Sequence, residues 1–180
     1  MKTTTKKFSG TNRREQLLKW LKSATAPLTG NELAELTHVS RQVIVQDISL
    51  LKAKNEPIIS TSGGYLYLQA TQETPTFQQV IVCKHSPEQT REELCLIVDH
   101  GVCVKDVKVE HPVYGDLSAS VMVSNRMEVE QFLNKIYYTN APLLSQLTDG
   151  LHLHTLEADS MAKINAACDS LKMAGILVES

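Results

Sequence analysis

The sequence predicts an α+β fold in two parts, a small helical part that ends in a β-hairpin and a larger α+β sandwich. Residues 1–70 carry ten Lys and Arg against five Asp and Glu, a balance of +5, whereas residues 71–180 have a balance of −7. Apolar residues recur with a helical period in the first part and alternate between strand and helix patterns in the second. We therefore expect a domain at 1–70, a polar linker at 71–77 and a second domain at 78–180.

The first part carries patterns for helices with defined starts. Apolar residues recur with a helical period over 13–24. Thr29 precedes Glu32 by three residues, the spacing of a capping box, and this predicts the start of a second, short helix. Residues 38–40 form a tight turn, and Ser40 is expected to cap a third helix.

The third helix, residues 41–55, has one apolar and one polar side. Ile44, Ile48 and Leu51 fall at i, i+4 and i+7 and are expected to face the core. A Gly63-Gly64 pair between β-branched and aromatic residues then predicts a hairpin. A short helix, a tight turn and a capped helix with a polar side form a helix-turn-helix, whose second helix fits a DNA major groove about 12 Å wide.

The polar side of the third helix carries the side chains that we expect to contact DNA. Arg pairs with guanine and Gln with adenine through two hydrogen bonds each, and basic side chains bind phosphates without specifying sequence. The expected base readers are Arg41, Gln42 and Gln46, with Ser40 at the helix start and Lys52, Lys54, Arg13 and Arg14 near phosphates. A helix-turn-helix that contacts only protein is the alternative.

The second part predicts the order β-α-β-β-α-β-α-β, with the helices on one face of a largely antiparallel sheet. Strands are expected at 77–85, at 102–111 and up to 124 around a turn at 114–116, at 151–158 and at 176–180, with helices at 87–99, 125–139 and 159–175. The alternation changes phase between Val104 and Val107, which predicts a bulge.

A pair of histidines stands in the apolar alternation of LHLHTLEA. Residues i and i+2 of a strand point to one face, so His152 and His154 can converge on one metal ion. His85, at the end of the first strand of this part, adds a third imidazole. The spacing of these residues does not decide which carboxylate joins the imidazoles, and the candidates are Glu88, Glu92 and Glu93. Such donors suit Zn²⁺, Ni²⁺ or Fe²⁺, and packing of the imidazoles is the alternative.

Composition excludes several other classes of protein. The polar, basic N-terminal residues argue against a signal peptide, and no apolar run approaches the roughly 18 residues of a membrane span. The four cysteines are scattered without a CxxC motif, so we expect reduced, mostly buried thiols and a cytoplasmic protein that binds no membrane.

Both parts of the chain resemble known families of protein domains. LTGNELAELTHVSRQVIVQDISLLKAKNEPIISTSGGYLY resembles the winged helix-turn-helix of biotin-repressor-like bacterial regulators. VCKHSPEQTREEL, VKVEHPVYGDLSASVMVSNRMEVEQFL and LHLHTLEA look like the three-histidine (3H) domain. In combination, over about residues 12–178, the chain resembles the niacin-responsive transcriptional repressors of bacteria.

This resemblance implies a homodimeric repressor, not an enzyme, of genes for NAD synthesis or niacin uptake. It would bind double-stranded operator DNA in response to nicotinic acid. The resemblance also implies one divalent transition metal per chain, foremost nickel or zinc, held by a His, a Glu eight residues later and an HxH pair. In this sequence those positions are His85, Glu93, His152 and His154.

The residues that contact nicotinic acid stay open. His111 matches a family histidine, although a structural role in closing a hairpin is the favoured alternative. Asn125 and Arg126 begin a helix whose N–H groups and positive charge suit a carboxylate. Three other functions compete with effector sensing: a metal-responsive transcriptional regulator, a metal-dependent hydrolase joined to a DNA-binding module, and a pure dimerisation domain.

Overall fold

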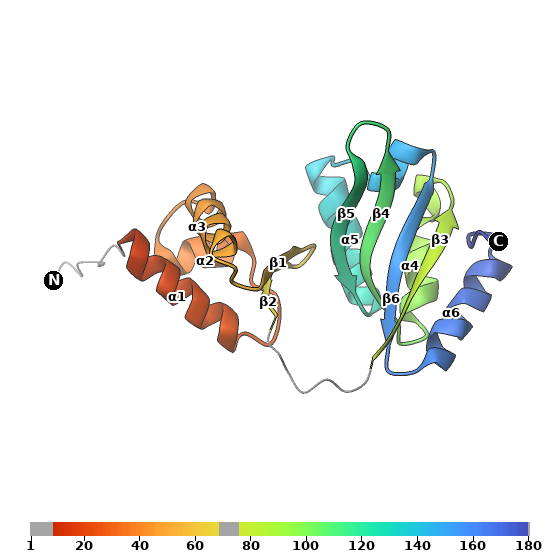
Figure 1. Ribbon diagram of the computed structural model, residues 1–180, viewed down its shortest axis with the longest axis horizontal. Helices are drawn as coiled ribbons and strands as arrows, with labels where there is room; N and C mark the ends of the chain where they lie inside the picture. The colour runs from red at the N-terminus through yellow and green to blue at the C-terminus, as the bar shows by residue number, and fades with distance from the viewer. Residues whose placement is uncertain (1–8, 69–75, 180) are drawn as a thin grey trace. The chain divides into compact units, whose positions relative to one another are not determined.

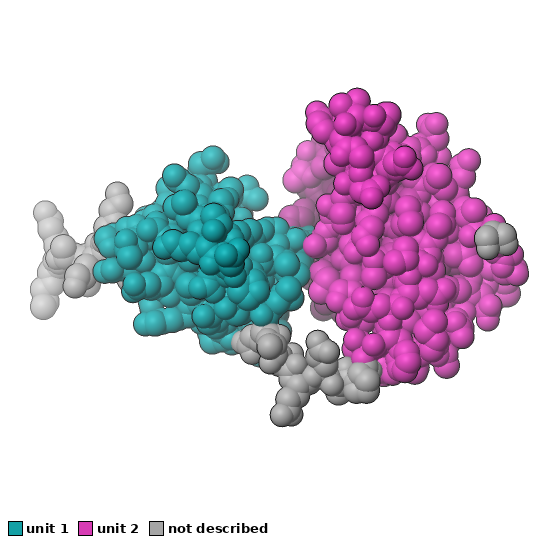
Figure 2. All heavy atoms as spheres, viewed as in Figure 1, with its two compact units in different colours: residues 1–71 teal, residues 72–180 magenta. Residues whose placement is uncertain are grey.

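The computed structural model describes residues 9–68 and 76–179 (Figure 1). The chain forms two compact units, Met1–Thr71 and Gln72–Ser180 (Figure 2). The buried core of each unit consists of side chains of that unit alone. Each unit therefore has the hydrophobic core that a domain needs.

Unit 1 begins with α1 (Gly10–Ser23), α2 (Gly30–Thr37) and α3 (Arg41–Ala53). The predicted capping box is present: Thr29 Oγ1 accepts a hydrogen bond from the Glu32 N–H at 3.2 Å, and the Glu32 carboxylate accepts one from the Thr29 N–H at 2.7 Å. A cap of this kind contributes about 1 kcal/mol. His38 is left-handed, with φ 53°, and turns the chain into α3. Ser40 is the N-cap of α3, although its side chain makes no capping hydrogen bond.

A hairpin that we call the wing follows α3. Its strands, β1 (Ile58–Thr61) and β2 (Gly64–Tyr67), pair antiparallel around the predicted glycine turn. Tyr65 also exchanges two backbone hydrogen bonds, of 2.8 and 2.9 Å, with Leu28, which lies just before α2. Gly64 has φ 136°, and a Cβ there would lie 2.5 Å from the Leu28 carbonyl oxygen. Glycine is therefore required where the wing meets the helices.

The core predicted for unit 1 is confirmed. Ile44, Ile48 and Leu51 of α3 are buried beside Leu17 and Leu21 of α1. Full burial of such a side chain contributes about 1.5–3 kcal/mol. This apolar side holds α3 in place and leaves its polar side toward solvent.

Unit 2 is a four-stranded antiparallel sheet in the order β3-β6-β4-β5 (Figure 1). Its elements, in which η denotes a 3-10 helix, are β3 (Phe77–Lys84), η1 (Pro87–Gln89), α4 (Thr90–Val98), β4 (Cys103–His111), β5 (Gly115–Val123), α5 (Arg126–Thr139), η2 (Leu144–Thr148), β6 (Leu151–Ala158) and α6 (Met161–Met173). The predicted α+β fold is confirmed. Of the expected linker, residues 71–75 lie outside the described residues, and Phe77 already belongs to β3.

The three helices of unit 2 pack on one face of this sheet. Leu94, Ile97 and Val98 of α4 are buried as predicted, in a cluster with Leu156 of β6 and apolar residues of α5 and α6. The central strand β6 therefore presents its buried side chains to the helices. No helix among the described residues is long and apolar enough to cross a membrane.

Two expectations about the sheet have different outcomes. The register of β4 shifts between Val104 and Asp106 against both of its neighbours, which confirms the predicted bulge. The strand predicted at 176–180 is wrong, because within the described residues Leu177 forms only an isolated bridge with Cys83. Around this bridge, the Lys84 N–H donates to the Ile176 carbonyl and the Val178 N–H donates to the Val82 carbonyl, each at 2.9 Å, so the contact with β3 is brief.

Candidate metal centre and DNA-binding surface

Strand β6 carries His152 and His154 on the helix-covered face of the sheet. Both side chains are buried, with exposed fractions of 2% and 3%. Strand alternation puts Leu151 and Leu153 on the opposite face, as predicted. The two imidazole centroids are 4.8 Å apart in an edge-to-face arrangement. The two rings thus share one buried space.

His85 and Glu93 reach the same space from two other elements. His85 directly follows β3, and a capping box after it turns the chain into η1 and α4. Glu93 lies in the first turn of α4 and is 1% exposed, whereas Glu88 and Glu92 are solvent-exposed. Burial therefore singles out Glu93 among the three carboxylates that spacing left open.

The Nε2 atoms of all three imidazoles point at the Glu93 carboxylate. His85 Nε2 lies 2.8 Å and His154 Nε2 lies 3.5 Å from Oε2, and His152 Nε2 lies 3.1 Å from Oε1. The structure thus brings together all four residues of the expected ligand set.

The opposite ring nitrogens are each held by a backbone carbonyl. His85 Nδ1 lies 2.7 Å from the Ser86 oxygen, His152 Nδ1 lies 2.9 Å from the Gly150 oxygen, and His154 Nδ1 lies 2.6 Å from the Asp106 oxygen. A carbonyl oxygen only accepts, so each Nδ1 carries a hydrogen and donates it. This arrangement fixes the ring orientation and leaves the Nε2 lone pair available for coordination, a feature also found in metal sites whose ligands are oriented by a second layer of hydrogen bonds.

The predicted bulge contributes directly to this arrangement. It falls at Asp106, whose carbonyl accepts from His154 and whose carboxylate accepts from the Thr155 N–H at 3.1 Å. Bulges are frequent beside functional sites because they redirect backbone groups out of the ladder.

This donor set fits a cation. With hydrogens on Nδ1, neutral imidazoles direct three Nε2 lone pairs at a carboxylate in a buried space, which is unfavourable unless positive charge lies among them. Burial opposes charge at Glu93, yet the histidines outweigh it and hold the pKa of Glu93 well below its usual value. Burial also opposes charge at His85 and His154, but the Glu93 carboxylate raises the pKa of both. Three imidazole nitrogens and one carboxylate suit Zn²⁺ or Ni²⁺.

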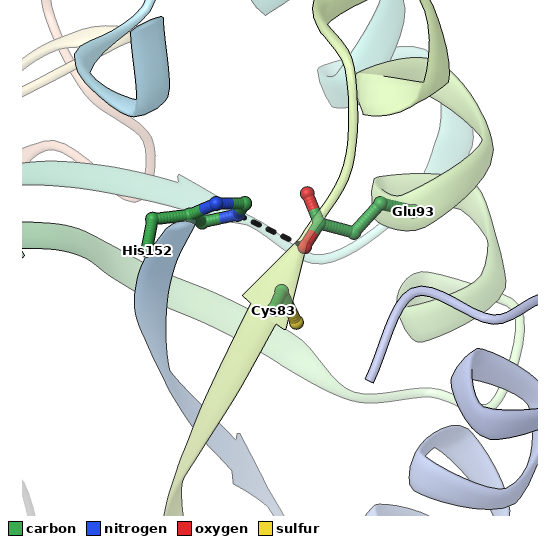
Figure 3. A group of neighbouring side chains, drawn as sticks. All are labelled: Cys83, Glu93 and His152. Atoms are coloured by element: carbon green, nitrogen blue, oxygen red, sulfur yellow. Dashed lines mark hydrogen bonds and ion pairs between the residues drawn. The ribbon is translucent and has the colours of Figure 1, made fainter. Parts of the chain in front are cut away.

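Cys83 is a neighbour of the site that the sequence reasoning did not include. It is fully buried on β3, paired in register with His152, and its Sγ lies within 4.8 Å of donor atoms of Glu93 and His152 (Figure 3). Burial and the nearby Glu93 raise the pKa of the Cys83 thiol. The thiol therefore stays protonated beside the carboxylate. Of the four free cysteines, the other three are only partly buried.

Gly150 is the second missed residue, and its carbonyl accepts from the His152 imidazole and from the His85 backbone N–H. Its own φ is 86°. A Cβ at this position would lie 2.1 Å from the backbone oxygen of His85. Only glycine fits where these two segments meet, and a Gly two residues before an HxH pair was the available sequence signal.

A cavity of about 180 Å³ opens beside the four residues. Its walls are mainly apolar and come from α4, the sheet, α5 and η2, including Leu94, Val107, Val121, Phe132 and Ile136. Cavities of roughly 150 Å³ with apolar walls hold a benzene ring. The cavity therefore has the size of a six-membered ring with a small substituent.

The three candidate effector residues do not line this cavity. Arg126 forms two hydrogen bonds, of 2.7 and 2.6 Å, with the Asp99 carboxylate, and Asn125 caps α5. His111 Nδ1 accepts from the N–H groups of Val113 and Tyr114, so this histidine closes the β4–β5 hairpin.

Unit 1 presents the predicted DNA-binding surface. Solvent-exposed side chains run along α3 from its cap, namely Ser40, Arg41, Gln42, Gln46 and Lys52. Lys52 Nζ also donates to Ser60 Oγ of the wing at 2.8 Å. The expectation for Arg13 and Arg14 needs correction: both pair with buried Asp47, at 2.5 and 3.2 Å, so they fasten α1 to α3. An isolated carboxylate is costly to bury, and the two arginines offset that cost.

Comparisons with known proteins agree with this architecture. An HTH domain model matches residues 13–66, and a 3H domain model matches residues 78–180. The transcription repressor NadR of Bacillus subtilis (strain 168) is 60% identical over 174 residues, which cover 96% of this chain and 97% of the relative. The probable transcription repressor NiaR of Thermotoga maritima is 36% identical over 167 residues, covering 93% and 94%.

The fold, the exposed α3 surface and these relatives define a DNA-binding transcriptional repressor, which is a regulator and not an enzyme. Within that class, the chain belongs to the 3H-domain family, and in this chain an HTH domain precedes the 3H domain.

Proposed function

We propose that this repressor binds operator DNA as a homodimer in response to nicotinic acid and controls genes for NAD synthesis or niacin uptake in the bacterial cytoplasm. Its 3H unit would hold one nickel or zinc ion through His85, Glu93, His152 and His154. The metal would supply a Lewis-acidic positive charge at one end of the cavity.

One observation carries the proposal: three Nε2 atoms and a carboxylate converge in a buried space that borders an apolar cavity. Convergent donors with fixed ring orientation favour a metal ion, and a ring-sized cavity beside them favours a small aromatic acid. The resemblance to niacin-responsive repressors agrees with both.

The homodimer is supported by the face of the sheet opposite α4, α5 and α6, which no helix of unit 2 covers within the described residues. Val80, Val82, Leu151 and Leu153 lie on this face, and Val80 and Leu151 are 53% and 44% exposed. A second copy is the partner that would cover these apolar side chains. A two-fold dimer would present two copies of α3, which calls for an inverted-repeat operator.

The test is binding to DNA from the upstream region of the protein's own gene, measured by fluorescence anisotropy. Nickel-loaded protein would be titrated with no addition and with nicotinic acid, nicotinamide or NAD. We expect nicotinic acid to tighten binding at least tenfold and chelation to abolish this response. Equal affinity in every condition would contradict both the effector and the metal.

Two matched variants place the response at the proposed site. Glu93→Gln removes the buried charge, whereas Glu92→Gln makes the same change one residue earlier on the exposed side of α4. We expect E93Q to lose bound metal and the response, and E92Q to keep both. Loss of metal in both variants, or in neither, would contradict the ligand set.

A metal-responsive regulator is the second candidate. All four donors come from the protein itself and converge on one another, and this observation favours direct metal sensing. Titration of nickel at fixed nicotinic acid, and then of nicotinic acid at saturating nickel, separates the two functions. An operator response that is complete with nickel alone would favour metal sensing.

A further inference from the structure

The cavity beside the metal centre lacks basic side chains. Among the described residues that line it, the ionisable ones are His85, Glu93, His152 and His154, and neither Lys nor Arg is present. A carboxylate needs a cation or several hydrogen bonds to be buried. A cation that these four residues would hold is therefore the partner that the cavity would offer to the carboxylate of a bound acid.

Three residues with hydroxyl groups line this cavity, Thr90, Ser120 and Ser145, and Thr90 is the one that stands out. It is the first residue of α4, it lines the cavity and it is 7% exposed. Its Oγ1 is buried and has no hydrogen-bond partner among the described residues. Buried hydroxyl groups are satisfied in most proteins, so an unsatisfied one that borders a cavity points to a ligand.

The metal centre itself explains why this hydroxyl is free. A helical Thr commonly donates to the carbonyl four residues earlier, as Thr37 does at 2.6 Å and Thr139 does at 2.7 Å. For Thr90 that carbonyl belongs to Ser86, which already accepts from His85 Nδ1 at 2.7 Å and from the Gln89 N–H at 3.0 Å.

We propose that Thr90 is an effector-binding residue that recognises a heteroaromatic monocarboxylate by donating a hydrogen bond to its ring nitrogen. This inference rests on the proposed function. Thr90 and Glu93 are three residues apart on one helix, which places their Cβ atoms roughly 5–6 Å from each other. Both residues line the same cavity, so the hydroxyl and the four donor residues can face one bound ligand. The carboxylate lies toward the metal centre, Leu94 and Phe132 flank the ring, and the ring nitrogen faces Thr90.

This arrangement explains how one small cavity would select nicotinic acid. Nicotinamide has the ring nitrogen but lacks the negative charge. Benzoic acid has the charge and the ring but offers no acceptor to Thr90, so the hydroxyl would stay unsatisfied. Rejection of an analogue that leaves a buried polar group unpaired is a strong source of specificity.

The experiment compares Thr90→Val, which keeps the shape and removes the hydroxyl, with Thr90→Ser, which keeps the hydroxyl. Nickel-loaded full-length protein would be titrated with nicotinate and with benzoate by calorimetry, and nickel content would be measured for each variant. We expect T90V to weaken nicotinate binding about tenfold, to tighten benzoate binding because no hydroxyl is then left unpaired, and to leave nickel content unchanged. T90S should bind nicotinate within about threefold of the wild type.

Each other outcome decides against a particular claim. Unchanged nicotinate binding by T90V, or equal losses for both acids, would overturn the role of Thr90 while leaving the proposed function intact. Equal binding of nicotinate and benzoate by the wild type would overturn recognition of the ring nitrogen. Failure of the wild type to bind nicotinate would overturn the proposed function, and this inference with it.

Discussion

Gly150→Ala is expected to damage the metal centre through a backbone collision. The new Cβ would lie 2.1 Å from the backbone oxygen of His85, a distance that forces one of the two segments to move. The shift would break the 2.9 Å hydrogen bond from His152 Nδ1 to the Gly150 carbonyl and the 3.4 Å bond from the His85 N–H to the same oxygen.

The expected cost follows from these contacts. A non-glycine residue at φ 86° costs about 1–2 kcal/mol, and each lost hydrogen bond adds about 1 kcal/mol. We therefore expect unit 2 to lose about 3–4 kcal/mol of its free energy of unfolding. Because His152 would lose the group that orients it, nickel affinity should fall roughly 10–100-fold.

Urea unfolding followed by circular dichroism measures the stability, and Trp20 fluorescence reports unit 1 as an internal reference. Gly115→Ala is the matched control, since Gly115 has φ 69° but no neighbouring atom lies within 4 Å of the place that a Cβ would take. Gly115→Ala should lower the free energy of unfolding only by the about 1–2 kcal/mol that a non-glycine residue at positive φ costs. Equal costs for the two variants would refute the argument from close approach.

Three further predictions concern other parts of the chain. Asp47→Ala should destabilise unit 1 by about 3 kcal/mol, because it removes the buried carboxylate that pairs with Arg13 and Arg14 and so joins α1 to α3. Trp20 fluorescence in urea would measure this change. A change below about 0.5 kcal/mol would contradict the structural role. Gln46→Ala should relax specificity at one operator position, and binding to the preferred base there should lose about 1–3 kcal/mol of free energy. Lys52→Ala should weaken binding to all DNA sequences alike and reduce the number of ions released on binding by about one. Nickel binding requires neutral imidazoles, so nickel should be released as the pH falls below about 6, and retention at about pH 4 would count against histidine ligands.

Local sequence patterns predicted much of the fold. The capping box at Thr29, the apolar side of α3, the wing turn and the bulge after Val104 depend on residues that are close in sequence, and all four are present. The terminal strand was mispredicted because an apolar run does not reveal how many ladder hydrogen bonds it will form, and here Leu177 forms only an isolated bridge with the edge strand β3. The turn η2 was not predicted, since its sequence has no clear periodicity.

By itself, the sequence determined the two-part organisation, the helix-turn-helix and the placement of two histidines on one face of a strand. It left open which Glu joins them, until a resemblance selected Glu93. Only the tertiary structure decided that Glu93 is the buried one, that Asp47 engages Arg13, and that Gly150 and Thr90 border the site. The reason is distance along the chain: Glu93 and His152 are 59 positions apart, and Arg13 and Asp47 are 34 apart. Contacts of that kind depend on how whole elements pack, which no local pattern encodes.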